Sequence, residues 1–150
     1  ILKTMFGWAF SPDNVYRGYV KPEAIEIDGP FNYGDLRISP LPVVHGKVET
    51  HGFLFEHHGH PPVAYIPDVK EIPAATMALI QNVDILIIDA LRPSPHPTHL
   101  SIEESLATIQ ECGAQRAWLT HLGHENDQTA LEATLPAHIR VAYDGLRLPE

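Results

Sequence analysis

Three stretches decide the fold: Pro42-Val43-Val44-His45-Gly46, Ala64-Tyr65-Ile66-Pro67-Asp68 and Leu119-Thr120-His121-Leu122-Gly123-His124. In each, an apolar run typical of a buried strand ends near a His or an Asp, so we expect the polar group at the edge of a sheet. Neutral imidazole and carboxylate are ligands of zinc, manganese or iron sites that carry a water molecule. A single His at a strand end is most often an ordinary surface residue. Three such ends in one small chain favour a metal site.

Size and composition predict one domain with a buried core. The sequence has 150 residues, of which 44% are hydrophobic. The longest apolar run, Ile85-Leu86-Ile87-Ile88, is far too short to span a membrane. Cys112 is the only cysteine, which excludes an internal disulfide framework, and no signal-peptide pattern opens the chain. We therefore expect a cytoplasmic protein in which Cys112 is a packed side chain rather than a nucleophile.

The charge balance limits the partners. The formal net charge is −9, which disfavours binding to long nucleic acids but remains compatible with a small anionic substrate near bound metal ions.

The beginning, Ile1-Leu2-Lys3-Thr4-Met5-Phe6, lacks an initiator Met and is typical of the middle of a domain, so we expect a fragment.

Hydrophobic periodicity predicts an α/β fold, with strands first and then alternating strands and helices. Helix 101–112 has the strongest start signal, because Ser101 and Glu104 form a potential capping box. Strands are expected at 24–28, 35–44, 52–57, 62–66, 83–89, 115–120 and 139–148, and helices at 71–81, 101–112 and 126–135.

Four motifs follow one another along the chain. They are His45-Gly46-Lys47-Val48-Glu49-Thr50 with Gly52-Phe53, then Ala64-Tyr65-Ile66-Pro67-Asp68, then Pro95-His96-Pro97-Thr98-His99-Leu100-Ser101, and finally Leu119-Thr120-His121-Leu122-Gly123-His124. In this order they resemble the second half of a metallo-β-lactamase-fold hydrolase. The branch that they resemble most contains the phosphonate-pathway cyclic phosphodiesterase, and the final stretch from Val141 to Leu146 is also similar to that branch.

This resemblance implies an αβ/βα sandwich with two divalent metal ions at the edge of its sheets. His45 would ligate one ion, Asp68 would bridge both and His121 would ligate the other. Zinc, manganese and iron all suit such nitrogen and oxygen ligands.

The family's His-x-His-x-Asp-His motif aligns with no segment here. We therefore treat residues 1–150 as a single partial domain that provides about half of the coordination shell implied by the resemblance. Its own N-terminal half or a homo-oligomer partner is expected to complete the shell, since an unpaired sheet would otherwise expose edges and apolar faces. The cluster of His57, His58 and His60 reads better as a hairpin turn than as a replacement ligand set.

Several other polar residues are candidates near the site. The resemblance makes His99 a catalytic side chain that is not a ligand and that contacts substrate phosphate or protonates a leaving oxygen. His96 either touches substrate or stiffens its proline-rich loop. His124 is expected either to contact a metal-ligating residue or to touch substrate, and not to bind metal itself. Asp89 ends a strand and is placed to fix the tautomer of a neighbouring imidazole.

The function that these expectations favour is hydrolysis of a small or cyclic phosphodiester by a water that the metal ions acidify. A different hydrolase on the same fold remains open, namely a thioesterase, a lactonase or an RNA 3′-end nuclease. A non-catalytic half-domain that binds a partner chain is the third interpretation.

Overall fold

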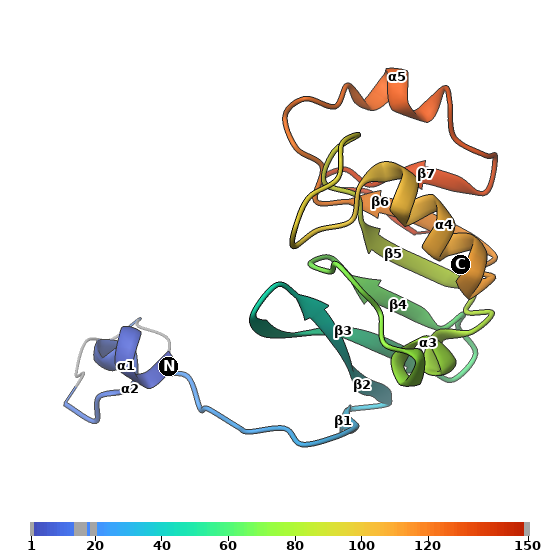
Figure 1. Ribbon diagram of the computed structural model, residues 1–150. Coiled ribbons are helices and arrows are strands. Elements are labelled where there is room, and N and C mark those ends of the chain that lie inside the picture. The colour runs from blue at the N-terminus through green and yellow to red at the C-terminus, as the bar shows by residue number, and fades with distance from the viewer. Residues whose placement is uncertain (1, 14–17, 19–20, 149–150) are drawn as a thin grey trace.

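The computed structural model describes residues 2–13, 18 and 21–148, and it contains a seven-stranded sheet (Figure 1). The strands lie side by side in sequence order. They are β1 (Phe31–Tyr33), β2 (Leu36–His45), β3 (Val48–His57), β4 (Val63–Ile66), β5 (Ile85–Asp89), β6 (Arg116–Thr120) and β7 (Ile139–Val141).

The sheet changes its pairing direction halfway across. Strands β1 to β4 pair antiparallel, and β4 to β7 pair parallel. Because β2 and β4 both pair antiparallel with β3, β2 runs in the same direction as β4, β5 and β6. The carboxyl ends of these four strands therefore meet at one edge of the sheet.

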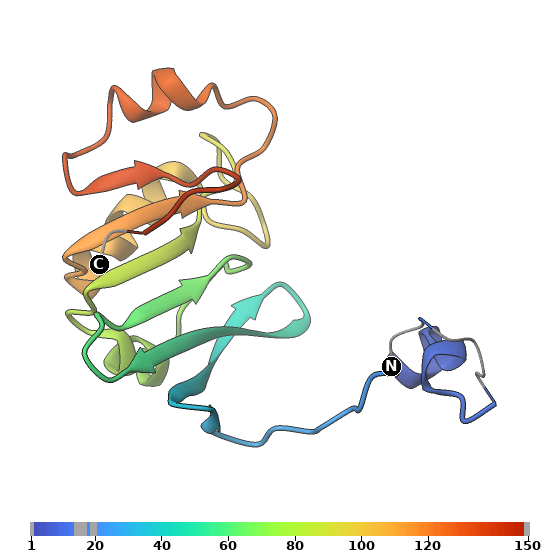
Figure 2. The same ribbon diagram turned by 180° about the vertical axis from the view of Figure 1, so that it is seen from behind.

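Two helices, α3 (Ala74–Ile80) and α4 (Ile102–Cys112), cover one face of the sheet. The other helices among the described residues are α1 (Leu2–Met5), α2 (Gly7–Phe10) and α5 (Gln128–Glu132). Figure 1 shows α3 and α4 in front of the strands, with α1 and α2 apart from the sheet. In Figure 2 the opposite face is crossed only by the C-terminal segment, among the residues that are described. No helix within the described ranges is long and apolar enough to cross a membrane.

Helix α4 begins at a complete capping box. The Ser101 hydroxyl accepts a hydrogen bond from the Glu104 N–H, and the Glu104 carboxylate accepts one from the Ser101 N–H. The helix ends at Gly113, whose φ of 71° suits glycine and whose N–H donates to the Ile109 carbonyl. Both ends of α4 are thus fixed by local sequence.

The core lies between the sheet and the helices. Its fully buried side chains include Leu86 and Ile88 from β5, Leu119 from β6 and Ile109 from α4. Cys112 is also buried, its thiol donates to the Ile80 carbonyl, and burial raises the pKa of the thiol. The expectation that this cysteine is a packed side chain is confirmed.

Most of the expected elements are present, with shifted ends. The strand expected at 24–28 is wrong, because residues 21–27 have no regular structure. The strand expected at 139–148 ends at Val141, since a turn follows in which the Leu146 N–H donates to the Tyr143 carbonyl. The helix expected at 126–135 is confined to Gln128–Glu132. The sequence did not predict β1, α1 or α2.

The Ser101 cap is expected to stabilise the whole fold. Ser101→Ala removes the acceptor of the Glu104 N–H and should lower the free energy of unfolding by about 1 kcal/mol. Urea denaturation of both proteins measures this loss. Gln110→Ala at an exposed position of the same helix is the control and should change stability by less than about 0.5 kcal/mol. An equal loss in the two variants would contradict the importance of the cap.

The ion pair of Glu104 should make stability depend on pH. The Lys70 ammonium, 2.6 Å away, lowers the pKa of the Glu104 carboxyl. The unfolded chain therefore binds this proton more readily, so the stabilisation is full above the unfolded-state pKa and is lost as pH falls through the folded-state pKa. We expect Glu104→Gln to be less stable than the parent at neutral pH by under about 1 kcal/mol, since both side chains are partly exposed. The difference should shrink below about pH 4, and a constant difference in pH-dependent urea denaturation would refute this assignment.

Candidate metal centre

Four strands deliver polar residues to the same edge of the sheet. His45 is the last residue of β2, Asp68 follows β4, Asp89 ends β5 and His121 follows β6. The Nδ1 atom of His121 lies 3.6 Å from Asp68 Oδ1 and 3.5 Å from Asp89 Oδ1. His45 and Asp68 also offer ligand atoms within 4.8 Å of each other. The predicted meeting of the strand ends that carry His45, Asp68 and His121 is therefore present in the structure.

Asp89 is the buried member of this group. Its side chain is 0% exposed, and Oδ2 accepts hydrogen bonds from the Val69 N–H at 3.1 Å and from His99 Nδ1 at 2.7 Å. The other oxygen, Oδ1, has no hydrogen-bond partner among the described residues. A buried carboxylate oxygen without a donor is unfavourable, so this position fits a cation.

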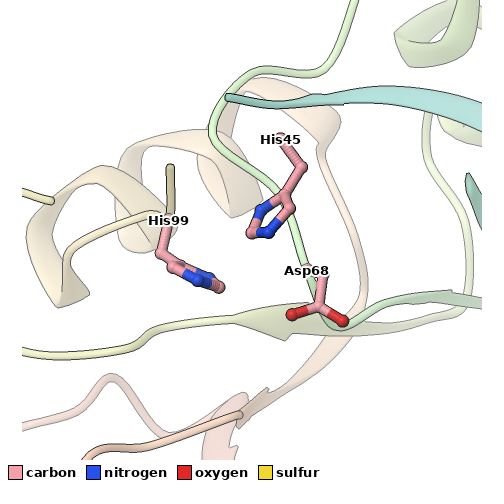
Figure 3. A group of neighbouring side chains, drawn as sticks. All are labelled: His45, Asp68 and His99. Atoms are coloured by element: carbon pink, nitrogen blue, oxygen red, sulfur yellow. The ribbon is translucent and has the colours of Figure 1, made fainter. Parts of the chain in front are cut away.

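Two histidines have one ring nitrogen already committed. The Nδ1–H of His45 donates to the Thr98 carbonyl at 2.8 Å, and the Nδ1–H of His99 donates to Asp89. Each ring is left with Nε2 for a metal ion, a substrate or a proton. Figure 3 shows both imidazoles and the Asp68 carboxylate pointing toward one another.

The ligand atoms form two overlapping groups. His45, Asp68 and His99 offer atoms within 4.8 Å of one another, and so do Asp89, His99 and His121. His99 belongs to both groups, and its ring centroid lies 4.6 Å from that of His45 and 4.8 Å from that of His121. This nitrogen and oxygen set fits a divalent ion such as zinc, manganese or iron.

His121 adopts an unusual backbone conformation. Its φ is 59°, in the left-handed region that few side chains other than glycine adopt. Such strain is concentrated at functional sites, where the surrounding structure holds it. Here it accompanies the placement of the ring between Asp68 and Asp89.

His96 lies beside His99, whereas His124 is an exposed residue that pairs with Glu125. The ring of His96 lies 5.0 Å from that of His99, and its Nδ1 accepts a hydrogen bond from the Thr98 N–H. Desolvation lowers the pKa of His96, and the nearby charge of Arg92 lowers it further. His124 is fully exposed, with Nδ1 3.8 Å from a Glu125 carboxylate oxygen, and among the described residues it belongs to neither donor group. His96 thus bonds within the loop that carries His99, and both of its expected roles stay predictions.

The His-rich hairpin is separate from the site. His57 ends β3, and His58, Gly59 and His60 form the exposed turn before β4. The interpretation of this cluster as a turn is confirmed.

Contacts across the loops hold the site together, and local sequence patterns gave no signal for them. The Lys70 N–H donates to the Val44 carbonyl at 2.7 Å, which ties the Asp68 loop to the end of β2. The Lys70 side chain reaches Glu104 at the start of α4. Gly46 packs so closely on Thr98 that an added Cβ would lie 2.7 Å from the Thr98 Cγ2 atom.

The chain folds as an α/β protein, and its candidate metal ligands lie together at one edge of the sheet. The chain belongs to the β-lactamase superfamily, because the family model described as Beta-lactamase superfamily domain matches residues 1–122. The predicted metallo-β-lactamase fold is confirmed by this match and by solved structures.

One similar solved structure belongs to the branch that the motifs resemble. A new diphosphatase from the PhnP family is 30% identical to this chain, with a TM-score of 0.83 over 99% of this chain and 54% of that one. Zn²⁺-bound PqqB from Methylobacterium extorquens shares the fold, with 21% identity and a TM-score of 0.68 over 92% of this chain and 58% of that one. The chain thus spans about half the length of these two structures.

A second relative is named for acyl transfer rather than for phosphate chemistry. The octanoyltransferase of Porphyromonas gingivalis (strain ATCC BAA-308 / W83) is 34% identical over 125 residues, which are 81% of this chain and 24% of that protein. Because three quarters of that protein lie outside the match, its activity does not define the aligned part.

The contact of Gly46 with Thr98 predicts a positioning role. Gly46→Ala should displace Thr98, and with it the carbonyl that orients His45, so zinc affinity should fall about tenfold or more in the full natural polypeptide. Competition with a chromophoric chelator measures the affinity. Gly59→Ala is a matched control, because Gly59 also has a positive φ but no atom within 4 Å of an added Cβ. Equal losses would show that backbone strain, rather than the Thr98 contact, is responsible.

Proposed function

We propose that this chain provides the C-terminal half of a metal-dependent hydrolase that cleaves a small or cyclic phosphodiester. The observation that carries the proposal is the meeting of His45, Asp68 and His121 around the hydrogen-bonded Asp89–His99 pair. In this proposal a His-x-His-x-Asp-His segment outside these 150 residues completes the coordination of two ions.

His45, Asp68 and His121 would hold the metal ions. The unpartnered Oδ1 of Asp89, 3.5 Å from His121, supports a positive charge at this position. Bound divalent ions would supply Lewis acidity, which lowers the pKa of a coordinated water and offsets the charge of phosphate oxygens. The donor types fit zinc, manganese and iron alike.

His99 acts on the substrate rather than on the metal in this proposal. Its Nδ1–H is held by Asp89, which fixes the tautomer and leaves Nε2 for the substrate. As an imidazolium, His99 can pass the Nε2 proton to the leaving oxygen while the buried carboxylate stabilises the positive ring. His96 and Thr98 keep the His99 loop in place through their hydrogen bonds.

A phosphodiester is favoured over an acyl substrate by the extent of similarity. The PhnP-family diphosphatase matches 99% of this chain, whereas the octanoyltransferase match leaves most of that protein unaligned. The net charge of −9 disfavours a long nucleic acid. A cytoplasmic location stays a prediction from the single cysteine.

Two variants separate metal binding from catalysis. His121→Ala removes a neutral nitrogen ligand, so metal content and turnover should fall together. His99→Ala should keep most of the metal but lower turnover about a hundredfold or more, since it removes a proton donor. The assay is paired metal analysis and hydrolysis of bis(p-nitrophenyl) phosphate and a cyclic phosphodiester by the full natural polypeptide.

His124→Ala is the control, because that ring is exposed and outside the donor groups. It should keep both metal and turnover. Full metal and activity in His121→Ala would refute the metal centre, and metal loss in His99→Ala would make His99 a ligand. Turnover of an octanoyl thioester but of no phosphodiester would refute the proposed substrate class.

A further inference from the structure

The loop that follows His121 is closed onto the end of β5. The Gly123 N–H donates to the Leu91 carbonyl at 2.7 Å, and the Asn126 side-chain Nδ2 group donates to the same carbonyl at 3.0 Å. Leu91 lies just beyond Asp89, whose Oδ1 atom is 3.5 Å from His121 Nδ1. The bonds that join these two loops therefore lie close along the chain to the candidate metal centre.

Asn126 joins the two loops through one half-buried side chain. Besides the Leu91 carbonyl, its Nδ2 group donates to the Gly123 carbonyl at 3.1 Å, and the Asn126 backbone N–H donates to that carbonyl at 3.1 Å. Both partners of Nδ2 are carbonyl oxygens, which only accept, so the amide must present its NH2 group rather than its oxygen to them. No residue with a side chain that only accepts could replace it.

His121 needs support from its loop because its backbone is strained. Its φ is 59°, a conformation that is uncommon outside glycine and that persists only where surrounding contacts hold it. On the β6 side, the Thr120 carbonyl accepts a hydrogen bond from the Ala90 N–H at 3.0 Å. On the other side, Asn126 holds the loop at the Leu91 carbonyl. The strained residue is thus held between two attachments to the end of β5.

The ring of His121 has less direct support than the other two imidazoles of the centre. The Nδ1 atoms of His45 and His99 make hydrogen bonds of 2.8 and 2.7 Å. His121 Nδ1 lies 3.6 Å from Asp68 Oδ1 and 3.5 Å from Asp89 Oδ1, and its side chain is 43% exposed. These separations are too long for strong hydrogen bonds. The position of the His121 ring therefore depends on the position of its backbone.

We propose that Asn126 is a positioning residue that holds His121 in place for metal binding. This inference rests on the role of His121 as a ligand in the proposed function. The Asn126 amide fixes the loop to the Leu91 carbonyl, and the loop fixes the backbone that carries the His121 ring. Because small displacements of a ligand atom weaken metal binding, loss of the amide should lower the affinity although every ligand is still present.

The zinc affinity of the full natural polypeptide tests this role. Asn126→Ala should lower the affinity about tenfold or more in competition with a chromophoric chelator. Gln81→Ala is the matched control, because the Gln81 Nε2 group also donates to two carbonyls, those of Glu111 and Cys112 at the end of α4. It should keep the zinc affinity of the parent. An equal loss of affinity in the two variants would overturn the proposal, because it would indicate general destabilisation.

The absorption of bound cobalt(II) gives a second readout, because its d–d bands report the geometry of the ligands. At saturating cobalt, the bands of Asn126→Ala should differ from those of the parent, and the bands of Gln81→Ala should not. Bands of Asn126→Ala that match those of the parent would overturn the proposal.

A double variant tests whether Asn126 acts through His121. His121→Ala/Asn126→Ala should bind zinc about as tightly as His121→Ala, because the amide then has no ligand to position. A further tenfold loss in the double variant would overturn the proposal. If His121→Ala keeps the zinc affinity of the parent, the proposed metal centre itself fails. If His121→Ala loses affinity and Asn126→Ala does not, the positioning role alone fails.

Discussion

The buried carboxylate of Asp89 is the constraint on which the rest of the site depends. A fully buried carboxylate is tolerated only when its surroundings compensate for the lost water. Oδ2 is compensated by the Val69 N–H and by His99, while the Asp89 carbonyl accepts from the Ser105 hydroxyl of α4. One residue thus joins β5 to the loop of Asp68, to the loop of His99 and to the helix behind them.

Rigidity of the loops follows from contacts made far along the sequence. Lys70 bonds to Val44 through its backbone and to Glu104 through its side chain, so the loop after β4 is held by both β2 and α4. The Glu104 carboxylate also accepts a hydrogen bond from the N–H of Ser101, the residue at the end of the His99 loop. Residues that bind metal or substrate need such support, because small displacements of donor atoms cost affinity and rate. The capping box therefore stabilises the helix and fixes the loop that carries His99.

The sequence predicted the elements whose patterns are local. His45, Asp68 and His121 could be found because each follows an apolar strand, and the shared direction of those strands brings them together. Asp89 was expected to bond a neighbouring imidazole, and its carboxylate accepts a hydrogen bond from His99. The contacts of Thr98 with His45 and Gly46 could not be found, because they join residues about 50 positions apart. The alternation at Ala24-Ile25-Glu26-Ile27 indicated a strand, but this segment pairs with no strand among the described residues. Strand formation depends on neighbouring strands more than on propensity.

The number of free donor atoms limits how many ligands these residues can give to each ion in the proposed function. His99 is common to both candidate donor groups, but its Nδ1 is bound to Asp89, so a single Nε2 remains for either group. If His99 serves the substrate, each group keeps two ligating residues, which is fewer than the three or four that hold zinc in proteins. Further donors are then required for each ion. Under the proposed function, these donors would come from polypeptide outside the 150 residues that reaches the strand ends carrying His45, Asp68 and His121.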